Sequence, residues 1–239
     1  MRDACLTHFF DWKKGDLTMP LPMVHLRIAQ QLADALPESL DRGAFYLGNI
    51  APDAIHMREG TTREDKQHTH FDPEKENHYT DRLQKLYHGY IDERTDEGWT
   101  SFVKGYFMHV MTDYYWFRSV YPEFVEQVRE YDKREGTTRT KEELSRLYYQ
   151  ETGQVDFHLF RTASWSADTW SILNAASGYD MRGRLTAEEI SRWRHHTYSF
   201  FHGQEPGIIP LFLTEEIVQA FAAATVPRLF ELLTVWEAV

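Results

Sequence analysis

Apolar residues recur every three or four positions along most of the chain, which is the spacing of one face of an α-helix. Between residues 23 and 37, for example, Val24, Ile28 and Leu32 lie on one face, and Pro37 closes the segment. No segment shows a strand-like alternation of useful length. The pattern predicts helices over residues 23–37, 76–91, 99–121, 122–136, 140–160, 185–201 and 214–233.

Local signals support several of these helices. Thr140 is followed three residues later by Glu143, and Thr186 by Glu189. This is the spacing of a capping box, in which side chains and backbone amides at a helix start bond reciprocally. Pro227 lies inside the last segment, where a proline is expected to kink the helix.

The stretch after the first predicted helix is less regular. A short apolar element within residues 41–60 is interrupted at 51–54, and the charged stretch that follows to about residue 73 predicts a flexible polar loop. The first 18 residues show no periodicity and are a candidate N-terminal extension. There is no repeat, low-complexity tract or glycine-rich phosphate loop. We therefore predict one all-α domain over residues 1–239, a compact multi-helix bundle.

The composition, with 42% apolar and 15% aromatic residues, is that of a folded globular protein. The single cysteine, Cys5, excludes an internal disulfide framework and cysteine-rich zinc modules. The first residues include several aspartates and no apolar stretch typical of a secretion signal. No run approaches the roughly 18 apolar residues of a membrane span. We expect a cytoplasmic protein without a transmembrane segment.

The formal net charge of −11 argues against nucleic acid as the main partner and against an anionic membrane surface, since both attract clustered Lys and Arg. An anionic substrate stays open, because a bound divalent cation would reverse the local field. The 12 histidines are many for this length, although some must lie at the surface.

The strongest candidate chemistry lies in the aromatic run GYFMHVMTDYYWF, residues 105–117. His109 and Asp113 are four positions apart, so both project from the same face of the predicted helix. A buried carboxylate is costly without a partner, and a divalent metal would satisfy both side chains. A His–Asp hydrogen bond, or an Asp–Arg pair, would serve as well. Gly105, one turn earlier, would allow close approach of another segment or of a substrate.

Asp53 and His70 are further candidate ligands. Pro52 disfavours a helical conformation at Ala51 and predicts a turn from which Asp53 points inward, although an aspartate here could simply cap the turn. His68 and His70 lie in the charged stretch before an aromatic residue, where they could also be solvated.

His25 lies beside the apolar face of the first helix, where it could be a ligand or an ordinary residue at the edge of the core. His56, three residues after Asp53, is a candidate for a supporting role or a second metal. His8, His78 and His88 are interpreted as surface residues.

The order of four short motifs resembles the zinc-dependent phospholipase C family, which includes many bacterial hydrolases. The motifs are H-x-x-I-A at 25–29, G-x-x-x-P-D at 48–53, T-H-F at 69–71 and H-x-x-x-D at 109–113, within a stretch from about Pro20 to Trp116. The resemblance implies an all-helical fold shared with nucleases of the P1 type, and zinc ions that activate a water for phosphodiester hydrolysis. It further implies one zinc held by Asp53, His70, His109 and Asp113, and another held in part by His25.

The chain also departs from that family pattern. Glu143, Glu151, Glu215 and Glu216 all lack a histidine four positions before them, and the residues after Asp113 include no further histidine nearby. We therefore expect one or two ions rather than three. A mixed His/Asp set also accepts Mn, Fe or Ni. Candidates to make up the shortfall are Asp156, His158, His195 and His196.

These observations predict a metal-dependent hydrolase acting on a small phosphorylated substrate through a metal-activated water, with Asp53 as general base. The alternative is a non-catalytic helical protein that keeps the fold and a reduced metal site. A phosphohydrolase of the HD type is disfavoured, because no histidine is followed directly by aspartate. The oligomeric state stays open.

Overall fold

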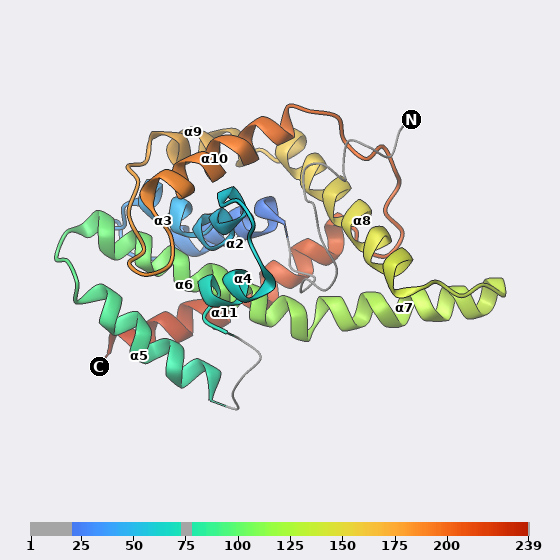
Figure 1. Cartoon of the computed structure of the whole chain (residues 1–239), viewed down its shortest axis with the longest axis horizontal. Coiled ribbons are helices and arrows are strands. Elements are labelled where there is room, and N and C mark those ends of the chain that lie inside the picture. Colours follow the sequence, from blue (N-terminus) through green and yellow to red (C-terminus); the bar gives the residue numbers. More distant parts are fainter. Residues whose placement is uncertain (1–20, 73–77, 239) are drawn as a thin grey trace.

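The computed structural model describes residues 21–72 and 78–238, and the regular elements in this part of the chain are helices, without a β-strand (Figure 1). The all-α prediction is confirmed. The first helices are α2 (Pro22–Ala35), α3 (Arg42–Gly48), the 3-10 helix η1 (Ala51–Met57), α4 (Arg63–Thr69), α5 (Tyr79–Ile91) and α6 (Glu97–Arg118). The later ones are α7 (Val120–Glu135), α8 (Lys141–Thr162), α9 (Ser166–Ala175), α10 (Ala187–Phe201) and α11 (Glu215–Glu237).

Helix α6 lies in the middle of the bundle and packs against α2, α3, η1, α5, α7 and α11 (Figure 1). Most of its residues are buried, including a run from Gly105 to Asp113. Helix α10 covers η1, and α7 projects from the body of the molecule. Any polar side chain on the inner face of α6 is therefore surrounded by other helices.

Two capping boxes form as predicted. The amide of Glu143 donates to the hydroxyl of Thr140 (3.2 Å) and the amide of Thr140 donates to the carboxylate of Glu143 (2.8 Å) at the start of α8. Thr186 and Glu189 make the same two bonds at the start of α10.

The predicted flexible loop before residue 73 is wrong, because residues 63–69 form helix α4. Its start is a third capping box, in which Thr62 and Asp65 exchange bonds of 2.9 and 3.2 Å. The aspartate replaces the usual glutamate, which hid the signal. The prediction for Ala51 is also wrong: η1 begins there, since a proline at the second helical position gives up an amide that has no intrahelical partner. Helix α9 was not predicted.

Two glycines bring α3 and α6 into backbone contact. A Cβ atom on Gly105 would collide with the carbonyl oxygen of Phe45, and one on Gly48 would collide with that of Phe102. The close approach expected at Gly105 is thus made by α3. This contact places the end of α3, including Asn49, against the polar side chains of α6.

Helix α11 has the length and apolar composition of a membrane span, contrary to the expectation from the sequence, and it is the one such helix in the described part of the chain. Core helices of soluble proteins pass the same test, and α11 packs against α2 and α6. This is weak evidence for membrane insertion. The helix continues through Pro227.

Replacing Gly105 with alanine is expected to lower the free energy of unfolding by about 1–3 kcal/mol or more, because the added methyl group meets the backbone of α3 and must push the two helices apart. Urea unfolding followed by circular dichroism measures this change. Gly89→Ala is the control, since nothing lies within 4 Å of a Cβ atom there. Alanine should stabilise α5 at that position by about 0.5–1 kcal/mol. Equal effects of both variants would contradict the close-packing interpretation.

Candidate metal centre

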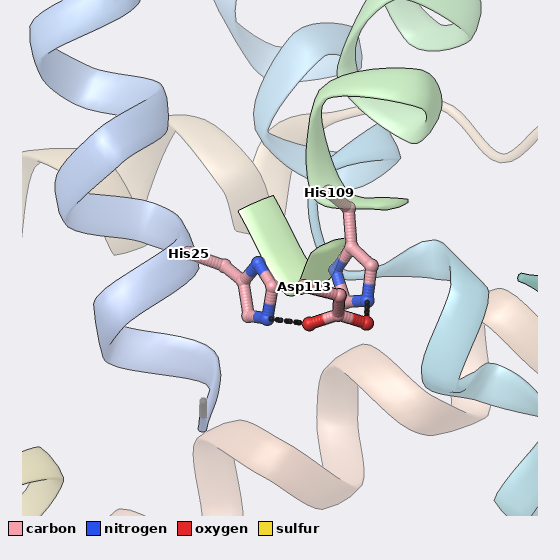
Figure 2. Close-up of side chains that lie close together, drawn as sticks. All are labelled: His25, His109 and Asp113. Atoms are coloured by element: carbon pink, nitrogen blue, oxygen red, sulfur yellow. Dashed lines mark ion pairs between the residues drawn. The ribbon is translucent and has the colours of Figure 1, made fainter. Parts of the chain in front are cut away.

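Five polar side chains meet on the inner side of the bundle. His25 comes from α2, Asp53 from η1, His70 from the residue that ends α4, and His109 and Asp113 from α6. Figure 2 shows three of them, with dashed lines that join the carboxylate of Asp113 to one nitrogen of His25 and one of His109. The rings of His25 and His109 stack on each other, with centroids 3.8 Å apart. The five residues singled out from the sequence as principal candidates therefore lie together.

The carboxylate of Asp113 is the centre of the group. Its Oδ1 lies 3.2 Å from Nε2 of His25, as the dashed line in Figure 2 marks. Its Oδ2 lies 3.3 Å from Nε2 of His70 and 3.4 Å from Nε2 of His109. One buried carboxylate thus contacts three imidazoles.

Asp53 completes the group from the side that is most accessible to solvent. Its oxygens lie 3.6 Å from Nε2 of His70 and 3.8 Å from Nε2 of His109. Its side chain is 14% exposed, against 3% for Asp113. Ligand atoms within 4.8 Å of one another form two sets that could hold a metal ion, His25–His109–Asp113 and Asp53–His70–His109.

Backbone carbonyls fix the hydrogen positions on two of the rings. Nδ1 of His109 lies 2.7 Å from the carbonyl oxygen of Asn49, and Nδ1 of His70 lies 2.9 Å from that of Lys66. A carbonyl oxygen can only accept, so both Nδ1 atoms carry hydrogen and donate. The two Nε2 atoms then direct their lone pairs into the group, where they are 3.3 Å apart.

Lone pairs facing each other at this distance repel unless a cation lies among them. Among the described residues, both oxygens of Asp113, both nitrogens of His25 and Oδ1 of Asp53 are buried without a hydrogen bond. The contact between His25 and Asp113 has the length of a hydrogen bond but not its angles. Imidazole nitrogen and carboxylate oxygen are the donors that zinc and its neighbours prefer, so the residues fit a divalent ion.

The electrostatics lead to the same requirement. Burial alone would raise the pKa of Asp113, but the neighbouring His109 and the other two rings hold that pKa well below its usual range. Burial likewise opposes a charge on His109, yet Asp113 raises the pKa of that ring. Burial and then His109 lower the pKa of His25. The protein therefore keeps an ionised carboxylate here, with either a proton or a metal ion as its counter-charge.

The backbone conformation directly after helix α4 helps to orient His70. Phe71 and Asp72, which follow it, adopt left-handed backbone conformations with φ of 59° and 49°. Such conformations are unfavourable for residues with side chains and persist only where the surroundings hold them. Phe71 is fully buried and stacks on Phe107 with ring centroids 4.7 Å apart, which provides that support.

The two secondary candidates lie outside both sets of metal-binding atoms. His68 is exposed and its Nε2 lies 3.2 Å from the carbonyl oxygen of Gly183. His56 is half-buried beside Trp193, with ring centroids 5.7 Å apart. Burial and the nearby Lys66 lower the pKa of His56 to about 4, so that ring is neutral at physiological pH.

The candidates from the second half of the sequence also lie outside these two sets of metal-binding atoms. His158 is exposed and pairs with Glu215 at 3.0 Å, and His195 is exposed on α10. His196 is half-buried against Trp193. Asp156 is fully buried on α8, and its carboxyl group contacts the start of α2 instead of the five-residue group.

Of the histidines interpreted as surface residues, His78 is exposed, His88 is half-buried and His8 lies outside the described residues.

Lys66 belongs to the site but was not anticipated. It is buried, and its Nζ lies 3.5 Å from Oδ1 of Asp53. The ammonium opposes the effect of burial and, with the nearby rings, holds the pKa of Asp53 well below its usual range. Its position one helical turn before His70 could have indicated it, had α4 been recognised as a helix.

Comparison with known proteins gives one result. The family model described as zinc dependent phospholipase C matches residues 24–174, which is more than half of the chain. No curated protein and no solved structure matches the chain.

Asp156 holds the start of the helix that carries His25, and its stability contribution should depend on pH. Its Oδ2 accepts the amide of Met23 (2.9 Å), but burial outweighs this bond and raises the pKa of Asp156 to about 8, from an ordinary value of 3.8. Between these two values the folded chain binds the proton more strongly than the unfolded chain does. The free energy of unfolding should therefore fall as pH rises from about 4 to about 8.

Asparagine does not titrate, so this fall in the free energy of unfolding should be absent in Asp156→Asn. The stability of the variant relative to the wild type should therefore increase as pH rises. Urea unfolding at pH 5 and pH 8.5, in the presence of a chelator, measures the difference. Asp168→Asn makes the same chemical change at an exposed position of α9 and should differ from the wild type equally at both pH values. A difference between wild type and Asp156→Asn that does not change with pH would show that the pKa of Asp156 is ordinary.

Proposed function

The chain belongs to the zinc-dependent phospholipase C family, and from this membership and the geometry of the centre we propose that it is a zinc-dependent hydrolase that cleaves a phosphoester. One observation carries the proposal: two rings anchored at Nδ1 bring their Nε2 atoms within 3.3 Å of each other, beside two carboxylates. A proton or a metal ion between these atoms would relieve the repulsion of their lone pairs, and the donor atoms suit zinc.

The proposed ligands of the principal ion are Asp53, His70, His109 and Asp113. His25, which contacts the other oxygen of Asp113, is the proposed ligand of a second ion. We propose one or two ions rather than three. In support, Trp116 and Tyr148, buried on α6 and α8, donate and accept a hydrogen bond of 2.7 Å. Aromatic side chains thus fill the stretch after Asp113, where the family pattern has a further histidine.

Zinc, when bound, acts as a Lewis acid and makes its water acidic near neutral pH. Asp53 is the proposed general base. Against the effect of burial, Lys66 and the nearby rings lower its pKa, so the carboxylate is ionised and able to accept a proton, although as a weaker base than an ordinary aspartate. It is also the most exposed member of the group, which is where a substrate and an attacking water arrive. Asp113, fully enclosed, has the separate role of holding three rings in place.

A small phosphorylated molecule is the proposed substrate. The centre combines two carboxylates with a divalent ion, which removes the negative field that would otherwise repel a phosphate group. The cytoplasmic location and the absence of nucleic acid as a main partner stay predictions. The donor set would also accept Mn, Fe or Ni.

The competing proposal is a non-catalytic metal centre. The enclosure of the group favours it, because four protein ligands can close a zinc ion against water, as structural zinc sites do. His25, His70, His109 and Asp113 have side chains that are at most 3% exposed. The two proposals differ in turnover, not in metal content.

The purified wild type is expected to carry at least one equivalent of zinc by elemental analysis, whereas His109→Ala and Asp113→Ala should carry far less. Zinc added to the chelated wild type should raise the melting temperature, since a ligand at 100 times its Kd stabilises the folded state by about 2.7 kcal/mol. His195→Ala, an exposed histidine outside the centre, is the matched control and should behave as the wild type. Equal zinc in all four proteins would place the metal elsewhere.

A panel of phosphomonoesters and phosphodiesters tests the reaction itself. The zinc-loaded wild type should release product, and a chelator should stop the release. Asp53→Asn, with its zinc content measured in parallel, should lower kcat by about 10²–10⁴, the usual contribution of a general base. Stoichiometric zinc without turnover of any compound in the panel would favour the non-catalytic centre instead.

A further inference from the structure

Two tyrosine side chains hold the backbone on either side of His70. The hydroxyl of Tyr106, on α6, donates to the carbonyl oxygen of Thr69 (2.7 Å). The hydroxyl of Tyr79, on α5, donates to the carbonyl oxygen of His70 itself (2.9 Å). A peptide group is planar, and these two carbonyls belong to the peptide groups before and after His70. Each tyrosine therefore fixes one of the two planes that flank a proposed metal ligand.

Both hydrogen bonds lie in the interior of the protein. Tyr106 is fully buried, and Tyr79, Thr69 and His70 are at most 3% exposed. The last carbonyl oxygens of a helix have no donor within that helix, and a buried carbonyl without a donor costs free energy. Helix α4 ends at Thr69, so the two hydroxyls supply donors from other helices where α4 no longer can.

Further side chains hold the neighbouring carbonyls in the same way. Arg82, on α5, donates to the carbonyl oxygens of Phe71 and Asp72, to the latter at 3.1 Å. Arg184, from the turn at residues 181–185, donates to that of His68. Phe71 and Asp72 have left-handed conformations, which persist only where the surroundings hold them. Donors from distant parts of the chain thus follow residues 68–72 one carbonyl after another.

The ring of His70 depends on this backbone, because the backbone dihedral angles restrict the rotamers that a side chain can adopt. Its Nδ1 donates to the carbonyl oxygen of Lys66 (2.9 Å). Its Nε2 lies 3.3 Å from Nε2 of His109 and 3.3 Å from Oδ2 of Asp113. Rotation of either flanking peptide group would turn the ring and move this nitrogen away from the other proposed ligand atoms.

We infer that Tyr79 and Tyr106 are positioning residues of the metal centre, whose hydroxyls fix the peptide groups around His70 and so hold its ring ready for the ion. The inference rests on the role of His70 as a ligand in the proposed function. Neither hydroxyl is itself a proposed ligand. Partners that orient a metal ligand typically change metal affinity by about 10–100-fold, so the effect belongs to metal binding and precedes any turnover.

The alternative is that each tyrosine only fills the core and satisfies its own hydroxyl, as buried tyrosines commonly do. The ring of Tyr79 lies 5.3 Å from that of Tyr114, and the ring of Tyr106 lies 5.7 Å from that of Phe71, between centroids. A phenylalanine keeps these ring contacts and removes only the hydroxyl. Under this alternative, the loss of a hydroxyl lowers stability and leaves metal affinity unchanged.

Tyr87 provides the matched control. It also lies on α5 and is 2% exposed, and its hydroxyl donates a hydrogen bond of the same length, here to the carboxylate of Glu237 (2.9 Å). Tyr87→Phe therefore makes the same chemical change in the same helix without touching the backbone around His70.

Zinc affinity of the purified full chain, measured by competition with a chromophoric chelator, tests the inference. Tyr79→Phe and Tyr106→Phe should each bind zinc about tenfold or more weakly than the wild type, whereas Tyr87→Phe should bind it as the wild type does. The visible absorption spectrum of the cobalt-loaded protein reports the ligand geometry. It should change in the first two variants only. Urea unfolding of the zinc-free proteins should show a comparable loss of stability in all three variants, because each loses one buried hydrogen bond.

Wild-type zinc affinity and an unchanged cobalt spectrum in Tyr79→Phe and Tyr106→Phe would overturn the inference. An equal loss of affinity in Tyr87→Phe would overturn it too, because the cause would then be general destabilisation. A wild type that binds no zinc has the same consequence. An effect in one variant alone would withdraw the role from the other tyrosine.

If one of the two variants does not fold, the other carries the test, since each hydroxyl holds one side of His70. None of these measurements uses a substrate. A protein whose zinc affinity depends on both hydroxyls but which hydrolyses nothing would therefore support this inference while refuting the hydrolase proposal.

Discussion

A buried, ionised carboxylate is the constraint on which the rest of the structure depends. Asp113 is enclosed by helices and contacts Nε2 atoms of three imidazoles. A charge in such surroundings is stable only with a counter-charge and with fixed polar partners. The bundle supplies the partners from separate elements, α2, α4 and α6. The chemistry of the centre therefore depends on how these helices pack.

Several features of the fold that cost folding free energy help to position the side chains around Asp113. Two glycines let α3 touch α6, and that contact places the carbonyl oxygen of Asn49 where it fixes the ring of His109. The left-handed turn after His70 directs its ring inward. Asp156, which is buried away from the centre, accepts a hydrogen bond from the amide of Met23. This bond fixes the start of α2, the helix that carries His25. Each device orients a donor atom before any ion binds, which is the pre-organisation that a metal centre needs.

Local signals in the sequence were sufficient to predict most helices and to place one pair of site residues on a shared helix face. His109 and Asp113 had to share a face because four residues separate them on a helix. The capping boxes at Thr140 and Thr186 marked their helices correctly. The third box, at Thr62, uses aspartate, and without it the charged sequence that follows looked like a loop. That one error also concealed Lys66, whose relation to His70 exists only on a helix.

What the sequence determined by itself was the all-α class, most helix positions and the residue types from which a metal centre could be built, since these follow from periodicity and spacing along a continuous segment. Tertiary structure alone decided which of the many histidines meet. It placed His25, Asp53 and His70 around Asp113 and left His68 and His195 at the surface. The physical reason is that convergence depends on how helices distant in sequence pack, and on which nitrogen of each ring a backbone carbonyl occupies.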